Sequence, residues 1–189
     1  MQNFRGLFPI FEHSSYINGC SHGPLSGPVR QAYLDYLSLR DTHGADWYAW
    51  VDKLTEVRGL LAQLLHCKNT ELAVTTSVSA GLNAFVSALR FDDKRNRVLC
   101  TDLDFPTTAQ IWHAQTARGA TVEHIGCKAD GCLDEDALIA ALDQTVKLVS
   151  IPQVCYRNGV LLNNELIQRI SKKAREVGAI IVLDSYQAV

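Results

Sequence analysis

AIIVLDSYQAV (residues 179–189) joins a run of apolar, mostly β-branched residues to a carboxylate, Asp184. Short apolar runs of this kind are typical of strands buried on both faces of a parallel sheet. The preceding segment, NNELIQRISKKAREVG (residues 163–178), has apolar residues at helical spacing between an Asn that can cap the start and a Gly that can end the helix. Residues 163–184 therefore predict a helix followed by a buried strand that ends on an acid.

The same alternation extends upstream to about residue 71. Further strands are predicted at residues 71–76, 96–102, 120–126 and 146–154, and further helices at residues 79–90, 106–119 and 133–143. Strands that alternate with helices of this length are typical of βαβ units. We therefore predict an α/β fold over residues 71–189, with a mostly parallel sheet and flanking helices.

Residues 1–70 have a different pattern. Two segments, residues 26–40 and 45–67, predict amphipathic helices that precede the sheet. We expect residues 1–70 to form an N-terminal arm with helices; part of an interface is the alternative.

Composition excludes several classes of protein. The chain is 47% hydrophobic and 20% charged, which is ordinary for a globular protein. A net charge of -2 argues against a nucleic-acid-binding surface. No run approaches the roughly 18 apolar residues that a membrane helix needs, and the first residues lack the pattern of a signal peptide. We expect a cytoplasmic protein that binds neither nucleic acid nor membrane.

The six cysteines are scattered along the chain, and none forms a C-x-x-C pair. Four lie in or beside apolar runs, so we expect reduced and mostly buried thiols. We predict neither a disulfide framework nor a metal site from them.

In parallel sheets, ligands bind at the carboxyl ends of the strands. TTSVSAG (residues 75–81) joins a predicted strand to a predicted helix, where free backbone N–H groups can bind a phosphate. The alternative is an ordinary Ser or Thr helix cap. Neither a P-loop nor a G-x-G-x-x-G motif is present, which argues against a nucleotide-binding domain of those types.

Two further strand ends carry candidate binding residues. In DFPTT (residues 104–108), Phe105 is placed to stack on a flat cofactor ring, or else to pack onto the helix that follows. In CYRNG (residues 155–159), Arg157 is placed to bind a substrate carboxylate, or else it is a surface residue of a turn that ends at Gly159.

Asp184 ends the last predicted strand. A carboxylate beside a buried strand needs a partner, and a protonated pyridine nitrogen is one that would keep the ring cationic. Gln187 is close enough in sequence to reach the neighbouring ring oxygen. The alternative is an Asp that caps a following turn.

Taken in order, these stretches resemble the class V aminotransferase family, the fold-type I pyridoxal 5′-phosphate (PLP) enzymes that include cysteine desulfurases and kynureninases. The resemblance implies that Val78 (backbone) and Ser79 bind the phosphate, that Phe105 stacks on the ring, and that Asp184 and Gln187 contact the ring nitrogen and oxygen. Gly81 and Asn83 also match the family's phosphate loop, whereas Ser77 and Ala80 differ from the residues of the desulfurase motif.

The resemblance extends to the N-terminal part. YINGCSHGPLSGPV (residues 16–29) is similar to the opening segment of the family near the substrate pocket, which implies that Asn18 and Arg157 bind the substrate. It also implies an amino-acid substrate and a homodimer for the full-length protein.

One feature of the family is missing. The lysine that would form a Schiff base with PLP is expected roughly twenty-five residues beyond the Asp, and all seven lysines of this chain precede Asp184. The small C-terminal domain is missing too. We therefore expect an N-terminal fragment whose residues 71–189 are an incomplete PLP-binding domain with no catalytic residue of its own.

The reaction stays open between transamination, desulfuration and Cβ–Cγ cleavage. A non-catalytic pseudoenzyme or interaction protein that retains the half-fold is the main alternative. An unrelated α/β nucleotide-binding domain is the third hypothesis.

Overall fold

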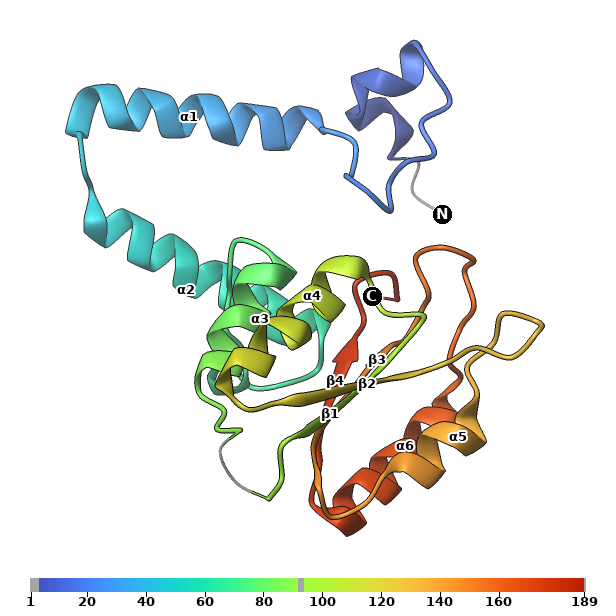
Figure 1. Ribbon diagram of the computed structural model, residues 1–189. Coiled ribbons are helices and arrows are strands. Elements are labelled where there is room, and N and C mark those ends of the chain that lie inside the picture. Colours follow the sequence, from blue (N-terminus) through green and yellow to red (C-terminus); the bar gives the residue numbers. More distant parts are fainter. Residues whose placement is uncertain (1–3, 92–93, 189) are drawn as a thin grey trace. The chain divides into compact units, whose positions relative to one another are not determined.

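The computed structural model describes residues 4–91 and 94–188. The chain divides into two compact units, Met1–Val74 and Thr75–Val189, and each is described by itself. Figure 1 shows the helical N-terminal unit in blue to cyan and the α/β unit in green to red.

The N-terminal unit contains the two predicted helices. Helix α1 spans Gly27–His43, and α2 spans Trp47–Leu64. Both begin at side-chain caps, because Ser26 accepts a hydrogen bond from the backbone of Val29 and Asp46 accepts one from that of Ala49. The described residues of this unit also form short 3₁₀ helices at Arg5–Leu7, Pro9–Glu12 and Asn69–Glu71.

The C-terminal unit is built on four strands that all run parallel. Their order in the sheet is β2-β1-β3-β4, and their bounds are Arg97–Thr101 (β1), Thr121–Ile125 (β2), Val146–Pro152 (β3) and Ile180–Asp184 (β4). The connecting helices are α3 (Val78–Ser87), α4 (Pro106–Ala114), α5 (Glu135–Ala141) and α6 (Asn164–Val177). The predicted α/β fold with a parallel sheet is confirmed.

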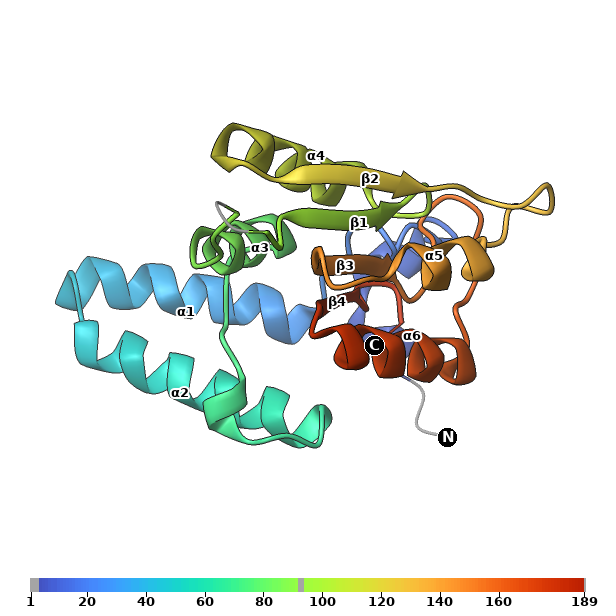
Figure 2. The ribbon, with the colours of Figure 1, turned by 60° about the horizontal axis from the view of Figure 1, so that its bottom comes forward.

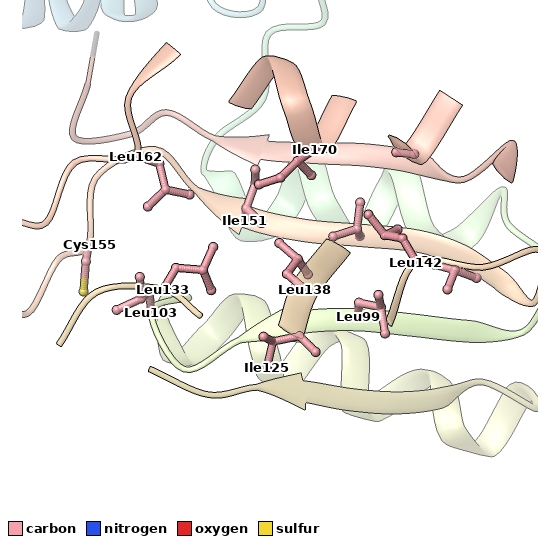
Figure 3. Close-up of a cluster of buried hydrophobic side chains, with 13 residues drawn as sticks. Leu99, Leu103, Ile125, Leu133, Leu138, Leu142, Ile151, Cys155, Leu162 and Ile170 are labelled. Carbon is pink, nitrogen blue, oxygen red and sulfur yellow. The ribbon is translucent and has the colours of Figure 1, made fainter. Parts of the chain in front are cut away.

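Helices cover both faces of this sheet (Figures 1 and 2). The face toward α5 and α6 holds the larger core, in which Leu99 and Ile151 from the strands pack with Leu138 and Ile170 from the helices (Figure 3). The opposite core combines strand residues with Val86 of α3 and Ile111 and Trp112 of α4. Alternate residues of β1 enter opposite cores, as the two-residue period of a strand requires.

Helices α6 and α4 begin at the residues that the sequence predicts. Asn163 caps α6 by accepting a hydrogen bond from the Leu166 backbone, and Gly178 ends it in the left-handed conformation. Helix α4 begins at Pro106, but its last turn tightens into a 3₁₀ helix, Gln115–Arg118, before Gly119.

The strand predicted at residues 71–76 is wrong. Glu71 ends a 3₁₀ helix, and residues 72–75 have no regular structure. Leu72 is extended, with φ -115° and ψ 136°, but an extended segment becomes a strand only when a neighbour supplies ladder hydrogen bonds. Within the described ranges, the four strands pair only with one another.

All six cysteines are free thiols. Cys100 and Cys155 are buried, Cys20 is exposed, and the other three are half-buried. Burial, followed by the negative charge of Asp104, raises the pKa of the Cys100 thiol to about 12, so this thiol stays protonated at neutral pH. Across residues 4–91 and 94–188, no helix combines the length and the apolar character that spanning a bilayer requires.

Candidate functional site

The carboxyl ends of β1, β3 and β4 lie at the same edge of the sheet, where the predicted binding residues of the strand ends are found (Figure 1). Pro152, the last residue of β3, is in register with Asp184, the last residue of β4. The loops that follow these strands therefore start side by side. A site at this edge draws its side chains from segments far apart in the sequence.

Asp104 is the most buried acid of this edge, with 6% of its surface exposed. Its Oδ2 accepts hydrogen bonds from the backbone N–H of Thr101 at 2.6 Å and from its hydroxyl at 2.8 Å, and its Oδ1 accepts one from the Ser150 hydroxyl at 2.9 Å. The carboxylate thus ties the end of β1 to β3.

Burial raises the pKa of Asp104 to about 6, against the hydrogen bonds from Thr101 and Ser150, which lower it. The negative charge of Asp184 raises it further. Two carboxylates therefore lie within electrostatic reach of each other at this edge. The DFPTT motif contains Asp104, but its role is not predictable from the motif, because its partner Ser150 is 46 residues away.

Phe105 is the N-cap residue of α4, and 47% of its surface is exposed. Its ring packs edge-on against Tyr156, with the centroids 5.0 Å apart and the planes at 75°. The contact joins the loops after β1 and β3, which leaves a large part of the Phe105 surface open to a ligand. Tyr156 is a second residue that sequence reasoning missed.

Arg157 lies one residue beyond this aromatic contact. Its Nη2 donates a hydrogen bond of 2.9 Å to the backbone carbonyl of Asp102, and the residue is exposed. One end of the guanidinium is thus anchored at the end of β1. The predicted Arg157 and Phe105 are brought to the same pair of loops.

Asp184 is half-buried at the end of β4. Its Oδ1 accepts a hydrogen bond of 3.0 Å from the Tyr186 backbone, so the turn-capping alternative describes part of its role. Oδ2 has no hydrogen-bond partner among the described residues. The backbone carbonyl of Asp184 accepts from Gln153, and the Ser185 hydroxyl donates to the Gln153 side chain at 2.9 Å.

Gln187 follows in a turn closed by a hydrogen bond from the Ala188 backbone to the Ser185 carbonyl, and it is half-buried. It already makes an interaction within the chain. The turn places it two residues beyond Ser185, in the loop that β4 leads into.

The start of α3 is the predicted phosphate-binding segment. Ser77 caps the helix by accepting a hydrogen bond of 3.1 Å from the Ala80 backbone, so the helix-cap alternative also holds. The first helical hydrogen bond runs from Gly81 to Ser77, which leaves the N–H groups of Val78 and Ser79 without an acceptor among the described residues.

Gly81, in the first turn of α3, lies close to the loop that precedes the helix. A Cβ atom at Gly81 would lie 3.3 Å from the hydroxyl oxygen of Thr75, whose hydroxyl donates to the Ser77 carbonyl at 2.9 Å. The loop from Thr75 to Ser77 folds tightly against the first turn of the helix. In the first turn of any α-helix the N–H groups point toward the N-terminal end, where an anion can bind.

Asn18 belongs to the N-terminal unit, so its relation to the strand-end residues stays a prediction. It accepts backbone hydrogen bonds from Ser21 and His22, and its side chain lies 3.8 Å from the Cys20 sulfur. Helix α3, with Val78 and Ser79, packs against α4, which begins beside Phe105.

Solved structures share this fold. A mutant of C-DES with glycine covalently linked to its PLP cofactor superposes with a TM-score of 0.83 at 19% identity, covering 100% of this chain and 51% of that one. The cysteine desulfurase CsdA from Escherichia coli superposes with a TM-score of 0.79 at 17% identity, covering 98% and 49% of the two chains. At such identities, the likeness shows the fold alone.

Sequence relatives give the same family. The uncharacterized aminotransferase YcbU of Bacillus subtilis is 29% identical over 187 residues, covering 99% of this chain and 49% of that protein. A kynureninase of Shouchella clausii is 30% identical over 198 residues, covering 97% and 45%. The chain spans about half the length of these relatives. The family model for aminotransferase class-V matches residues 29–189, and the chain belongs to this family.

Proposed function

We propose that this chain is the cofactor-binding part of a PLP-dependent enzyme that acts on an amino acid. The observation that carries the proposal is the edge of the sheet, where an acid with an unpartnered oxygen, an open aromatic ring and an anchored arginine follow three adjacent strands. Family membership supports it, as does the relatives' length, about twice that of this chain. A catalytic lysine would then lie on a further part of the protein.

The residues present fit PLP. The N–H groups of Val78 and Ser79 and the Ser79 hydroxyl would bind the phosphate, at the positive end of the α3 dipole. The open surface of Phe105 would pack on the ring. Oδ2 of Asp184 would accept a hydrogen bond from the ring nitrogen, and Gln187 would contact the ring oxygen.

When bound, the cofactor supplies an electron sink for bonds at the amino-acid carbon. The contribution of Asp184 is to hold a proton on the ring nitrogen, because an ion pair with the carboxylate favours the cationic ring. Asp104 lies within electrostatic reach of Asp184, and its hydrogen bond from Ser150 ties the loop that carries Phe105 to β3.

Fewer contacts support the proposed substrate-binding residues. Arg157, anchored through Asp102, would bind the substrate carboxylate with its remaining donors. Asn18 would contribute from the N-terminal unit, and the full-length protein would be a homodimer. Transamination, desulfuration and Cβ–Cγ cleavage all use such a site, and the choice among them stays open.

The test is a titration of the chain with pyridoxamine 5′-phosphate, measured by isothermal titration calorimetry. This probe has the ring and phosphate of PLP, but its amine does not react with surface lysines. We expect saturable binding of one molecule per chain. Asp184→Ala should weaken it about tenfold to a hundredfold, because a hydrogen bond to a charged group contributes about 1.5–3 kcal/mol, and Ser79→Ala should weaken it less.

Asp143→Asn is the matched control, since Asp143 is an exposed acid that bonds Thr145 and Arg97 away from the strand ends. It should bind the probe like the wild type. A chain that unfolds cooperatively yet shows no binding, or binding that Asp184→Ala does not weaken, would contradict the proposal. Tight binding of a dinucleotide instead would favour the nucleotide-binding alternative.

The extent of the native protein is a separate measurement. An intact mass well above 20.9 kDa from the native source would support the proposed fragment. A mass that matches these 189 residues would favour the pseudoenzyme.

A further inference from the structure

Two histidines from different elements meet on the surface of the C-terminal unit, and the proposed function does not use them. His113 lies on α4 and His124 on β2, and Figure 2 shows α4 lying along β2. Their Nε2 atoms are 2.8 Å apart. The ring planes differ by 16°, and the ring centroids are 5.0 Å apart.

These two distances fix how the rings face each other. A centroid separation of 5.0 Å with the Nε2 atoms only 2.8 Å apart requires both nitrogens to lie between the ring centres. The imidazoles therefore meet edge to edge, and their Nε2 atoms face each other along the line between the ring centres. One proton between the nitrogens satisfies this geometry, and one tetrahedral metal ion would fit after each ring turns by about 35°.

Asp102 orients one of the two rings. Its Oδ1 lies 3.5 Å from Nδ1 of His124, the nitrogen on the far side of the ring from His113. A carboxylate on one imidazole nitrogen holds the proton there and leaves the other nitrogen free to bind a metal. This arrangement of carboxylate, histidine and metal recurs around zinc.

The spacing of the rings suits a shared metal ion. Two Zn–N bonds of about 2.0–2.1 Å at a tetrahedral angle place the nitrogens about 3.3 Å apart, with the ring centroids about 5 Å apart. The observed centroid separation equals that of a two-histidine chelate, so binding requires the rings to turn and the Nε2 atoms to separate by about 0.5 Å, without the ring centres moving apart. Both histidines are exposed, which gives the rings room to turn.

We propose that His113 and His124 form a solvent-open site for one divalent transition-metal ion of the borderline class, Zn²⁺, Ni²⁺ or Cu²⁺, with Asp102 as the positioning residue. Imidazole nitrogen is a ligand that these ions favour over Mg²⁺ or Ca²⁺. Within the described ranges, no group of three or more His, Cys, Asp or Glu side chains is arranged to bind a metal. Water would therefore fill the remaining coordination positions, and the ion would exchange with solvent.

The test uses Ni²⁺ as the probe and calorimetry of the whole chain as the readout. We expect one Ni²⁺ per chain, with affinity that falls at least tenfold in His113→Gln and in His124→Gln. The double variant should lose this binding. Asp102→Asn should weaken it about tenfold, the lower end for a residue that orients a metal ligand. His43→Gln, a histidine of α1 in the other unit, is the matched control and should bind like the wild type.

Thiols are the main competing ligands, and Co²⁺ separates them from imidazole. The wild type should show d–d absorption without the near-ultraviolet band of thiolate bound to cobalt. Ni²⁺ binding that survives in the double variant, or a cobalt spectrum dominated by thiolate, would overturn the proposal. So would the absence of binding in the wild type, which would mean that the histidines share only a proton. Far-UV circular dichroism checks that each variant is folded.

Discussion

The two units bury their apolar residues to very different degrees. In α1 no residue is buried, and in α2 only Ala62 is. In β1 and β3, by contrast, all but one residue of each strand is buried. Large apolar side chains stay exposed on both N-terminal helices, among them Tyr33, Leu37, Trp47, Tyr48, Leu60 and Leu64. An apolar stripe stabilises a helix only when a second layer covers it, and in the described residues of the C-terminal unit the helices pack on the sheet in this way.

Local contacts carry more of the stability of the N-terminal helices. Beyond the two caps, α1 has a hydrogen bond between Gln31 and Asp35, and α2 has an ion pair between Lys53 and Glu56. Pairs of this spacing contribute about 0.2–0.5 kcal/mol each. We therefore expect the C-terminal unit to unfold as the main cooperative transition, with the N-terminal helices contributing little to it.

The largest expected contrast is between core and helix-surface leucines. Leu148→Ala removes a fully buried side chain of β3, and we expect the free energy of unfolding to fall by about 2–5 kcal/mol. Leu37→Ala on α1 truncates an exposed side chain and should change it by less than about 0.5 kcal/mol.

Urea unfolding measures both substitutions. Trp112 is buried in the C-terminal unit, so replacing Trp47 and Trp50 by Phe makes its fluorescence report that unit alone. Equal losses for Leu148→Ala and Leu37→Ala would mean that the helices share the cooperative core. That result would contradict the distinction between the two units.

The next effect concerns the buried acid of the strand ends. The pKa of Asp104 is raised to about 6 in the folded state by burial, above its value of 3.8 in the unfolded chain. The folded state therefore binds the proton more tightly, and the resulting stabilisation is complete below pH 3.8 and lost as the pH rises through 6. Relative to Asp104→Asn, the wild type should lose up to about 3 kcal/mol between pH 4 and pH 7.

Urea unfolding of both proteins across this pH range is the measurement. Asp143→Asn gives a control of opposite sign, because hydrogen bonds from Thr145 lower the pKa of the exposed Asp143 carboxyl. That stabilisation is present above the unfolded pKa and disappears on acidification. A difference between wild type and Asp104→Asn that does not vary with pH would show that Asp104 is not the buried acid described above.

Local patterns predicted most of the fold, and non-local pairing explains what they missed. Strands β1 to β4 were predicted from apolar runs, and their helices from periodicity and caps such as Asn163 and Pro106. The strand predicted at residues 71–76 failed because its existence depends on a neighbouring strand, which its own residues do not encode.

The candidate site shows the same difference between local patterns and non-local pairing. Phe105, Arg157 and Asp184 were found because each follows a recognisable apolar strand. Asp104 and Tyr156 were missed as site residues because their roles depend on which strands become neighbours. Their contact partners, Ser150 and Phe105 respectively, come from other segments of the chain. The histidine pair was missed for the same reason, since no sequence spacing relates a helix residue to one on the following strand.

The smallest contrast compares two helix caps of the same geometry. Asn163 accepts from the Leu166 backbone at 2.9 Å, and Ser26 accepts from the Val29 backbone at 3.3 Å. Helix α6 packs Ile170 into the core, whereas α1 buries no residue. Asn163→Ala should therefore lower the stability of the C-terminal unit by about 1 kcal/mol, and Asn163→Asp should retain most of it.

Ser26→Ala should leave the same Trp112-reported transition unchanged, although it removes an equivalent hydrogen bond. The reason is that a cap stabilises the cooperative unit only if its helix unfolds with that unit. Far-UV circular dichroism without denaturant would show instead a small loss of helix in the N-terminal unit. A shift of the Trp112 transition by Ser26→Ala as large as that by Asn163→Ala would mean that α1 is coupled to the sheet despite its exposed apolar side chains.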